Sequence, residues 1–342
     1  MILHKIERRN FVRNLALGSL GLGMLDTSAF AIGKNLPPEE LKVGIVGLSV
    51  HSAAFSQILN YPNKNSDLAG CRITALYHPP GNPDVDFTQV QLDKFEEDIV
   101  AMGVKIVGSM DEMIDMVDVV MIETNDGRPH LDEVLPAFKA GIPVFVDKPV
   151  AATLPGVLQL YEKAREYKVP VFTSSALRYV DNVKQINKEE VLSAFTYSPA
   201  ALEKSHTDLF WYGIHGVELL YAAMGAGCTE VMQVQHSDKE DLVIGYWNNN
   251  RTGSFRGIRS GRGGFGGTVF MANEIVTLDP FTGYRSLVVK IVEFFKTNIP
   301  PVSMEETIEI YTFMEAAQQS KRRGGVKISL EKTLKNAYKS IK

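Results

Sequence analysis

The sequence predicts an α/β fold, in which a doubly wound parallel sheet is followed by an α+β domain with an open antiparallel sheet. Short apolar runs alternate with helical patterns between residues 41 and 178, as is typical of parallel strands joined by right-handed crossovers. After residue 179 the pattern changes to β-rich segments joined by short polar turns. The 342 residues, 45% of them hydrophobic, suffice for the cores of two domains.

The N-terminus resembles a targeting segment. Arg8 and Arg9 stand together before Phe11, a mildly apolar, Gly-rich stretch follows, and the stretch ends in the small-x-small pattern Ala29-Phe30-Ala31. This arrangement resembles a twin-arginine export signal, which would deliver a folded protein to the periplasm. The alternative is the basic N-terminus of a cytosolic protein. We expect a signal peptide at 1–31, a linker at 32–40, and domains at 41–178 and 179–342.

Six parallel strands are expected in the first domain because six short apolar runs there end at turn residues. They are the runs 42–47, 73–77, 104–107, 119–122, 144–146 and 169–173. Ser109 and Glu112 form a capping box that starts a short helix. Apolar spacing predicts a second helix over 131–138, bent by Pro136, and a third over 154–167.

The second domain is predicted to be mostly antiparallel sheet. Its strands are expected near 193–197, 231–236, 242–247, 253–259 and 268–278. One helix, at 214–224, interrupts the strands, and a capping box of Ser303 and Glu306 starts a C-terminal helix. The glycine-rich stretch 261–267 lies between two strands with no helix after it. We therefore interpret it as a flexible hairpin loop rather than a phosphate site.

Composition excludes several classes of partner and site. The net charge of −4 argues against nucleic acid. Beyond the N-terminus no apolar run approaches the roughly 18 residues of a membrane span, so no membrane insertion is expected after signal removal. Cys71 and Cys228 lie in apolar surroundings of different domains and should be free and buried. No cysteine or histidine cluster has metal-ligand spacing, which predicts no metal site.

The turn after the first strand could bind a dinucleotide. A nucleotide fingerprint would read G-x-G-x-x-G, so that backbone N–H groups meet a pyrophosphate at a helix N-terminus. Here the turn reads GLSVHS, with serine at the second and third glycine positions. Serine is small and can donate to phosphate, so Gly47, Ser49 and His51 are candidate cofactor contacts. An ordinary α/β turn is the alternative.

His78 ends the second strand, where an acid would normally bind a ribose. A histidine there could stack on adenine or lie near a 2′-phosphate, or it could be a solvated turn residue. The choice between NAD and NADP therefore stays open.

The stretch from residue 118 to 149 carries the most specific pattern. Its first strand ends in the polar turn Thr124-Asn125, His130 begins a helix that ends in Ala-Gly, and its second strand runs into Asp147-Lys148-Pro149. This pattern resembles the Gfo/Idh/MocA oxidoreductases, the family of glucose–fructose oxidoreductase and inositol dehydrogenase, with aspartate in place of the family's usual glutamate. The resemblance covers the chain after the N-terminal segment. It implies a Rossmann-type dinucleotide-binding domain at 41–178 and a substrate and oligomerisation domain at 179–342.

The resemblance implies that Thr124, Asn125, His130, Asp147 and Lys148 contact the cofactor. For Lys148 there is also a physical reason. A lysine at the carboxyl end of a parallel strand lies in the crevice where α/β folds bind ligands. Its ammonium can stabilise the alkoxide character that grows on a substrate oxygen during hydride loss. A solvated lysine at a strand end is the alternative.

The helix near residue 214 supplies a second group of candidates. His215 matches a histidine that often serves as general base in the family, and Trp211 replaces the acid four residues before it. Trp211 and Tyr212 add aromatic faces of the kind that stack on sugars, and Tyr212 is a further catalytic candidate. A core histidine is the alternative for His215. Arg178, at the end of the sixth strand, could bind substrate hydroxyls or form a structural ion pair.

These features predict an NAD(P)-dependent oxidoreductase that transfers hydride between a nicotinamide cofactor and a secondary alcohol of a sugar, polyol or glycoside. One alternative is a glycosidase or lyase that retains its dinucleotide and acts by transient oxidation and elimination. Another is a non-catalytic sugar-binding relative that has lost its cofactor. The expected partner is a small carbohydrate, and the resemblance implies a homo-oligomer.

Replacing Arg8 and Arg9 together by lysine should keep the protein in the cytoplasm, because the export route reads the arginine pair. Cell fractionation measures this, with Arg13→Lys, which leaves the pair intact, as the matched control. Unchanged periplasmic location of the double variant would remove the export argument.

Overall fold

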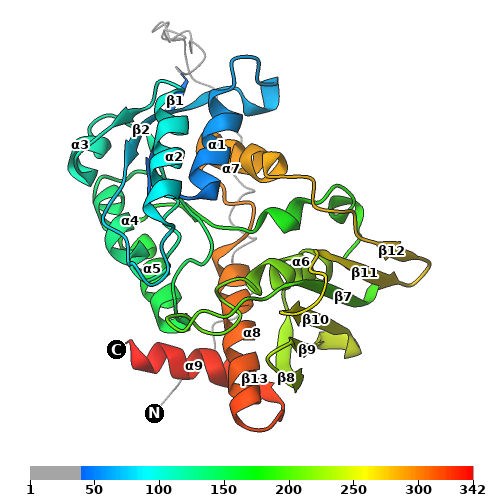
Figure 1. The fold of residues 1–342 in the computed structure, drawn as a ribbon. Coiled ribbons are helices and arrows are strands. Elements are labelled where there is room, and N and C mark those ends of the chain that lie inside the picture. The colour runs from blue at the N-terminus through cyan, green and yellow to red at the C-terminus, as the bar shows by residue number, and fades with distance from the viewer. Residues whose placement is uncertain (1–39, 342) are drawn as a thin grey trace, which may run out of the picture. The chain divides into compact units, whose positions relative to one another are not determined.

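The computed structural model describes residues 40–341; the predicted signal peptide at 1–31 and all but one residue of the linker lie outside this range. Within it, a six-stranded parallel sheet has the order β3-β2-β1-β4-β5-β6 (Figure 1). Its strands are β1 (Leu41–Val46), β2 (Cys71–Tyr77), β3 (Lys105–Ile106), β4 (Val119–Ile122), β5 (Val144–Val146) and β6 (Val171–Phe172). The predicted doubly wound sheet is confirmed. Its strand order reverses between β1 and β4, where such sheets bind ligands.

Helices cover this sheet. They are α1 (Val50–Asn60), α2 (Gln89–Val100), α3 (Met110–Ile114), α4 (His130–Lys139) and α5 (Leu154–Tyr167), with the short 3₁₀ helix η1 (Ser66–Leu68). α5 has the predicted bounds, and α4 contains Pro136 as expected. α2 was not predicted. It buries only Leu92 and Ile99, so its apolar pattern is too sparse to mark a helix.

The second sheet has seven strands in the described chain, in the order β12-β11-β7-β10-β9-β8-β13. They are β7 (Val191–Pro199), β8 (Cys228–His236), β9 (Glu240–Trp247), β10 (Thr252–Ile258), β11 (Gly266–Met271), β12 (Ile275–Thr277) and β13 (Ile328–Ser329). The expected antiparallel pairing is confirmed except between β7 and β10, which run parallel. The chain between these two strands passes through a helix, β8 and β9, which lets β10 return in the direction of β7.

The glycine-rich stretch does not form the predicted hairpin. β10 and β11 are not neighbours, because both border β7 on opposite sides. The segment 259–265 therefore crosses over the end of β7. Gly266 and Gly267 belong to β11, and an added Cβ on Gly267 would lie 2.5 Å from the Phe195 carbonyl oxygen.

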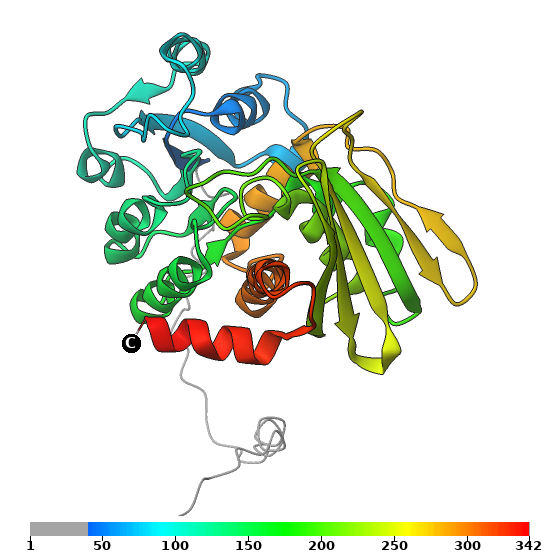
Figure 2. The same ribbon diagram turned by 60° about the horizontal axis from the view of Figure 1, so that its bottom comes forward.

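The remaining helices cover one face of the second sheet and return to the first. They are η2 (Ala176–Tyr179), η3 (Val183–Gln185), α6 (Ile214–Met224), η4 (Asn248–Asn250), α7 (Arg285–Thr297), α8 (Met304–Arg322) and α9 (Leu330–Ser340). α6 packs on β7 and β10 and α8 packs on β8, on the same side of the sheet (Figure 2). α7 instead packs against α1 and buries Ile291 and Phe294 in the same apolar cluster as Phe172 of the first sheet.

Cys71 and Cys228 are free and buried, as predicted. Burial raises the pKa of the Cys71 thiol to about 11, so it is not a thiolate at neutral pH. In residues 40–341 no helix combines the length and the apolar character that a bilayer span requires.

Arg178 forms structural ion pairs, which was one of the two roles that the sequence left open for it. Its guanidinium is buried, donates to Glu218 Oε2 at 3.0 Å, and also pairs with Glu306. These bonds join η2 to α6 and α8. Glu218 is buried, and burial raises its pKa to about 7 although Arg178 opposes this shift. Both partners lie 40 or more residues away in sequence, so local pattern could not reveal them.

Arg178→Met should lower the free energy of unfolding by about 3–5 kcal/mol, because it leaves a buried carboxyl without its partner. The loss should be larger at pH 8 than at pH 5. Without the arginine, the Glu218 pKa rises further in the folded state. The folded state then holds a proton that the unfolded state does not hold, so the free energy of unfolding of the variant falls as pH increases.

Urea denaturation at both pH values measures this effect. Lys94→Met, which removes an exposed ion pair on α2, is the control and should leave the midpoint unchanged. A loss no larger than that of the control would contradict the structural role of Arg178.

Candidate functional site

Two cavities open beside the carboxyl ends of β1, β4 and β5. The first is lined by Gly47, His78, Thr124 and Asn125, together with the loop 79–86 after β2. The second is lined by Ser49, His51, Asn125, Asp147, Lys148, Tyr212 and His215, with the aromatic side chains of Phe87, Phe265, Phe281 and Tyr284. Asn125 borders both cavities. Most of the residues that the sequence singled out therefore meet at one edge of the first sheet.

Gly47 makes the tight turn that the first strand needs. Its φ is +91°, and a Cβ atom there would lie 2.6 Å from the backbone nitrogen of Thr124. Any larger residue would thus be strained and would collide with the loop after β4. The bare backbone at this point borders the first cavity.

The two serines that stand in place of fingerprint glycines form a reciprocal cap on α1. Ser49 Oγ accepts from the backbone N–H of Ser52 at 3.1 Å, and Ser52 Oγ accepts from the N–H of Ser49 at 2.7 Å. The hydroxyls thereby satisfy two amides at the start of the helix. The N–H groups of Val50 and His51, in the same first turn, have no intrahelical acceptor and remain suited to an anion.

The first cavity contains a buried polar atom without a partner, His78 Nδ1. The side chains of the adjoining loop are held in place. Thr124 Oγ1 donates to Glu133 at 3.0 Å, and Asn125 Nδ2 donates to the carbonyl of Val85 at 2.9 Å. His78 therefore has an unused ring nitrogen where the sequence placed the ribose or adenine contact.

The position of His130 does not support its predicted contact with the cofactor. It is fully buried at the start of α4 and lines neither cavity. One ring nitrogen lies 2.9 Å from the Thr124 carbonyl oxygen and the other 3.2 Å from that of Val150. The ring therefore ties the loop after β4 to the chain after β5.

Lys148 lies in the second cavity, as predicted, directly after β5. It is 9% exposed, and the Lys148–Pro149 peptide is cis. Its Nζ lies 3.9 Å from Asp147 Oδ2, and the same oxygen contacts His51 Nδ1 at 2.7 Å. Burial disfavours the Asp147 anion, but His51 and Lys148 outweigh this effect and lower the Asp147 pKa below its usual range. Asp147 is therefore a carboxylate held between two nitrogen groups.

His215 reaches the same cavity from the first turn of α6. Its Nδ1 lies 2.8 Å from Ser175 Oγ, a hydroxyl rather than the carboxylate usual for such a histidine. Burial lowers the pKa of His215 well below the usual value, and the charges of Lys148 and His51 lower it further. The ring is thus neutral at pH 7. If Nδ1 donates to Ser175, Nε2 is free to accept a proton.

Tyr212 and Trp211 have different positions. Tyr212 lines the second cavity, and its ring lies edge-on to His215 at 5.0 Å. Trp211 is not among the residues that line this cavity, and its ring packs on His206 at 4.9 Å. The predicted contact of Trp211 with substrate is therefore not supported by its position. His206 approaches the loop after β4 through Asp126 Oδ1 at 3.5 Å.

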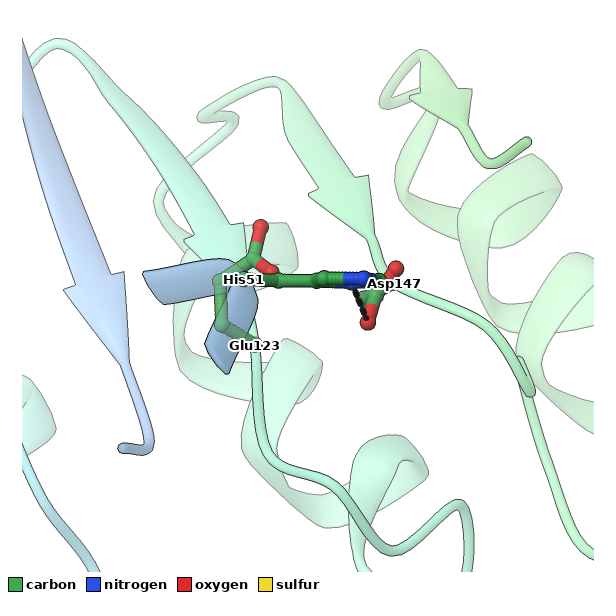
Figure 3. A group of neighbouring side chains, drawn as sticks. All are labelled: His51, Glu123 and Asp147. Atoms are coloured by element: carbon green, nitrogen blue, oxygen red, sulfur yellow. Dashed lines mark hydrogen bonds and ion pairs between the residues drawn. The ribbon is translucent and has the colours of Figure 1, made fainter. Parts of the chain in front are cut away.

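Glu123 is the principal residue that sequence reasoning missed. It directly follows β4, is fully buried, and neither carboxylate oxygen has a partner. Burial, and next the negative charge of Asp147, raise its pKa well above the usual range. Ligand atoms of Glu123, His51 and Asp147 all lie within 4.8 Å of one another (Figure 3). The only sequence signal for Glu123 was its place directly after four apolar residues. Its neighbours Asp147 and His51 lie 24 and 72 positions away in the sequence.

Ser175 and the aromatic wall were also missed. Ser175 lies between β6 and η2, and Phe281 and Tyr284 lie in the segment before α7. Nothing in the local sequence of these residues indicates proximity to Lys148. Phe281 and Tyr284 reach the cavity because α7 returns to the first sheet, and Ser175 contacts His215 from the segment after β6.

Comparison with known proteins agrees with this geometry. Residues 41–175 match the oxidoreductase family with an NAD-binding Rossmann fold, Gfo/Idh/MocA. No curated protein matches the sequence. Among solved structures, a probable dehydrogenase from Thermotoga maritima has a TM-score of 0.68 at 19% identity, covering 86% of this chain and 100% of its own.

Two further solved structures share the fold over most of this chain. Scyllo-inositol dehydrogenase from Lactobacillus casei, with bound NAD(H) and scyllo-inositol, has a TM-score of 0.65 at 14% identity, covering 86% of this chain and 100% of its own. Myo-inositol 2-dehydrogenase from Lactobacillus plantarum has a TM-score of 0.67 at 16% identity, covering 85% and 99%. The likeness extends through the second sheet. Residues 41–175 are thus similar to the NAD-binding Rossmann fold of the Gfo/Idh/MocA oxidoreductase family.

Proposed function

We propose that this protein is an NAD(P)-dependent oxidoreductase that acts on a secondary alcohol of a sugar, polyol or glycoside. The observation that carries the proposal is the meeting of Lys148 and His215 in one cavity at the carboxyl edge of a Rossmann sheet. One residue can supply positive charge and the other can accept a proton. The inositol dehydrogenases of the same fold support a polyol-like substrate.

The residues present fit a dinucleotide. Gly47 provides backbone that nothing larger could replace, and the unpartnered His78 Nδ1 borders the first cavity. The amides of Val50 and His51 are suited to the phosphates, and Lys148 and Asp147 to the nicotinamide end. When bound, the nicotinamide accepts the hydride from the carbinol carbon. Neither cavity distinguishes NAD from NADP.

Lys148 and His215 have different roles in the reaction. Lys148 Nζ donates a hydrogen bond to the reacting oxygen and stabilises its developing negative charge. His215 Nε2 accepts the hydroxyl proton as the carbon becomes a carbonyl. Ser175 holds the ring from the other side, and the aromatic side chains of Tyr212, Phe265 and Tyr284 limit access of water to the cavity.

One observation favours a second candidate, a sugar-binding protein without cofactor. The serine cap on α1 uses two amides at the position where a dinucleotide-binding turn offers them to phosphate. A glycosidase or lyase acting by transient oxidation would share every residue of the first proposal. Product analysis on aryl glycosides separates that reaction from simple oxidation.

Two features of the proposal lie outside the site. Export to the periplasm by the twin-arginine route depends on residues before 40. Homo-oligomerisation would use the face of the second sheet opposite α6, where Leu192 and Phe270 are exposed.

Lys148→Met should reduce kcat by about 10²–10³-fold. The substitution keeps the length of the side chain but removes the positive charge that stabilises the reacting oxygen. Hydride transfer is followed by nicotinamide absorbance with inositols and aldoses, using NAD⁺ and NADP⁺ in parallel. Lys184→Met, on the exposed side of η3, is the control and should keep full turnover.

The same preparations are denatured, and the released small molecules are identified by mass spectrometry. Absence of dinucleotide binding in the parent protein would favour the sugar-binding candidate. Unchanged turnover of the lysine variant would remove Lys148 from the mechanism.

His215→Asn should lower kcat by roughly 10²-fold, at the low end for a positioned base, and should abolish the acid limb of the pH–rate profile. In the parent, activity requires neutral His215 and is lost as pH falls through its pKa. Because burial and Lys148 lower that pKa, the limb should lie below the ordinary histidine value of about 6.5.

This region is also bordered by Asp147, His51 and Glu123. The acid limb must therefore be assigned to His215 from the difference between the pH–rate profiles of the parent and the variant. If His215→Asn keeps the whole pH dependence and near-parental turnover, the base lies elsewhere. Tyr212 is then the next candidate.

A further inference from the structure

Three polar side chains from separate parts of the chain converge at the edge of the second cavity. Glu123 directly follows β4, Asp147 directly follows β5, and His51 lies in the first turn of α1 after β1. The three strands are neighbours in register, since Ile122 pairs with both Val46 and Val146. The backbone continues this alignment, because Glu123 N–H donates to the Val46 carbonyl and Asp147 N–H to that of Ile122.

This cluster is not satisfied by the protein around it. Both oxygens of Glu123 and Oδ1 of Asp147 are buried without any hydrogen-bond partner. Glu123 is 0% and Asp147 3% exposed. A buried polar atom without a partner costs about 1–3 kcal/mol, and more when it is charged. Three such oxygens in one place are suited to a ligand of positive charge.

We propose that His51, Glu123 and Asp147 bind a divalent transition-metal ion of the zinc type, a site that shares His51 and Asp147 with the proposed cofactor site but does not require the redox function. One imidazole nitrogen and two carboxylates suit zinc and its neighbours better than magnesium or calcium, which prefer six or more oxygen ligands. Three protein ligands leave a coordination position open. His51 and Asp147 line the second cavity, so the open position faces the place of the substrate.

The geometry requires only small adjustments. Around a tetrahedral zinc ion with bonds of about 2.0–2.2 Å, ligand atoms lie about 3.3 Å apart. In the structure, His51 Nδ1 and Asp147 Oδ2 are 2.7 Å apart, and no pair of ligand atoms exceeds 4.8 Å. Glu123 can turn toward the ion without breaking a hydrogen bond.

The neighbours of His51 also favour coordination. Its ring stacks on Phe55 at 5.3 Å and meets the edge of Tyr284 at 4.7 Å, which fixes its plane with Nδ1 toward Asp147 (Figure 3). The ion would balance the two carboxylates. The buried oxygens of Glu123 would no longer need a proton to remain in the core.

Full-length protein without an affinity tag is stripped with chelator and titrated with Co²⁺ and Zn²⁺, in the absence of substrate and dinucleotide. We expect one ion per chain by elemental analysis, a visible Co²⁺ absorption of low-symmetry coordination, and a higher Tm with Zn²⁺. Glu123→Gln keeps the side-chain shape but removes a charged ligand. It should weaken binding by more than about 100-fold, beyond the effect of losing an outer hydrogen-bond partner.

Glu133→Gln is the matched control. Glu133 is another buried glutamate with an unpartnered oxygen, but it lies in α4 outside the cluster, so Co²⁺ binding should be unchanged. His51→Ala supplies a second variant if Glu123→Gln fails to fold. The proposal is overturned if the parent binds neither ion, or if the cluster variants bind Co²⁺ as tightly as Glu133→Gln. Because these readouts need no turnover, metal binding and hydride transfer can fail separately.

Discussion

The register of β1, β4 and β5 is the constraint on which the site depends. Val46, Ile122 and Val146 are paired neighbours, so the three strands end at the same level. The residues that follow are therefore brought together at one edge of the sheet. Because side chains alternate along a strand, a slip of one residue in β5 would turn Asp147 and Lys148 each to the opposite face of the sheet. The fully buried apolar side chains of these strands prevent such a slip.

The same edge concentrates charge that the protein must balance without much water. Lys148 faces Asp147. Burial and the charge of Lys148 lower the pKa of His215, whereas the charge of Asp147 opposes this shift. A neutral histidine beside a lysine divides the two tasks of oxidation between different residues, one electrostatic and one proton-accepting. Glu123 adds a second acid beneath this pair. Its high pKa shows that the surrounding side chains alone do not compensate a negative charge there.

Sequence predicted those features that are encoded locally. The apolar runs gave all six parallel strands, and the bounds of α5 and α6 agree with the structure to the residue. Lys148 and His215 were found because each follows a short, specific motif. The hydrogen-bond partners of Arg178 and His130 could not be predicted because they come from distant segments. No periodicity or spacing carries that information.

The first turn of α1 shows how far the site departs from a glycine-rich phosphate loop. Three glycines would leave the backbone N–H groups at the start of the helix without side-chain partners. Ser49 and Ser52 instead cap the helix with their own hydroxyls and stabilise α1 without any bound anion. This fixed first turn also determines where His51 projects, because a capped helix start has little freedom to rotate. The amides of Ser49 and Ser52 are thus not available to a phosphate. The same turn holds the imidazole of His51 against Asp147. The serine cap at positions 49 and 52 and the contact of His51 with Asp147 therefore both depend on this first turn of α1.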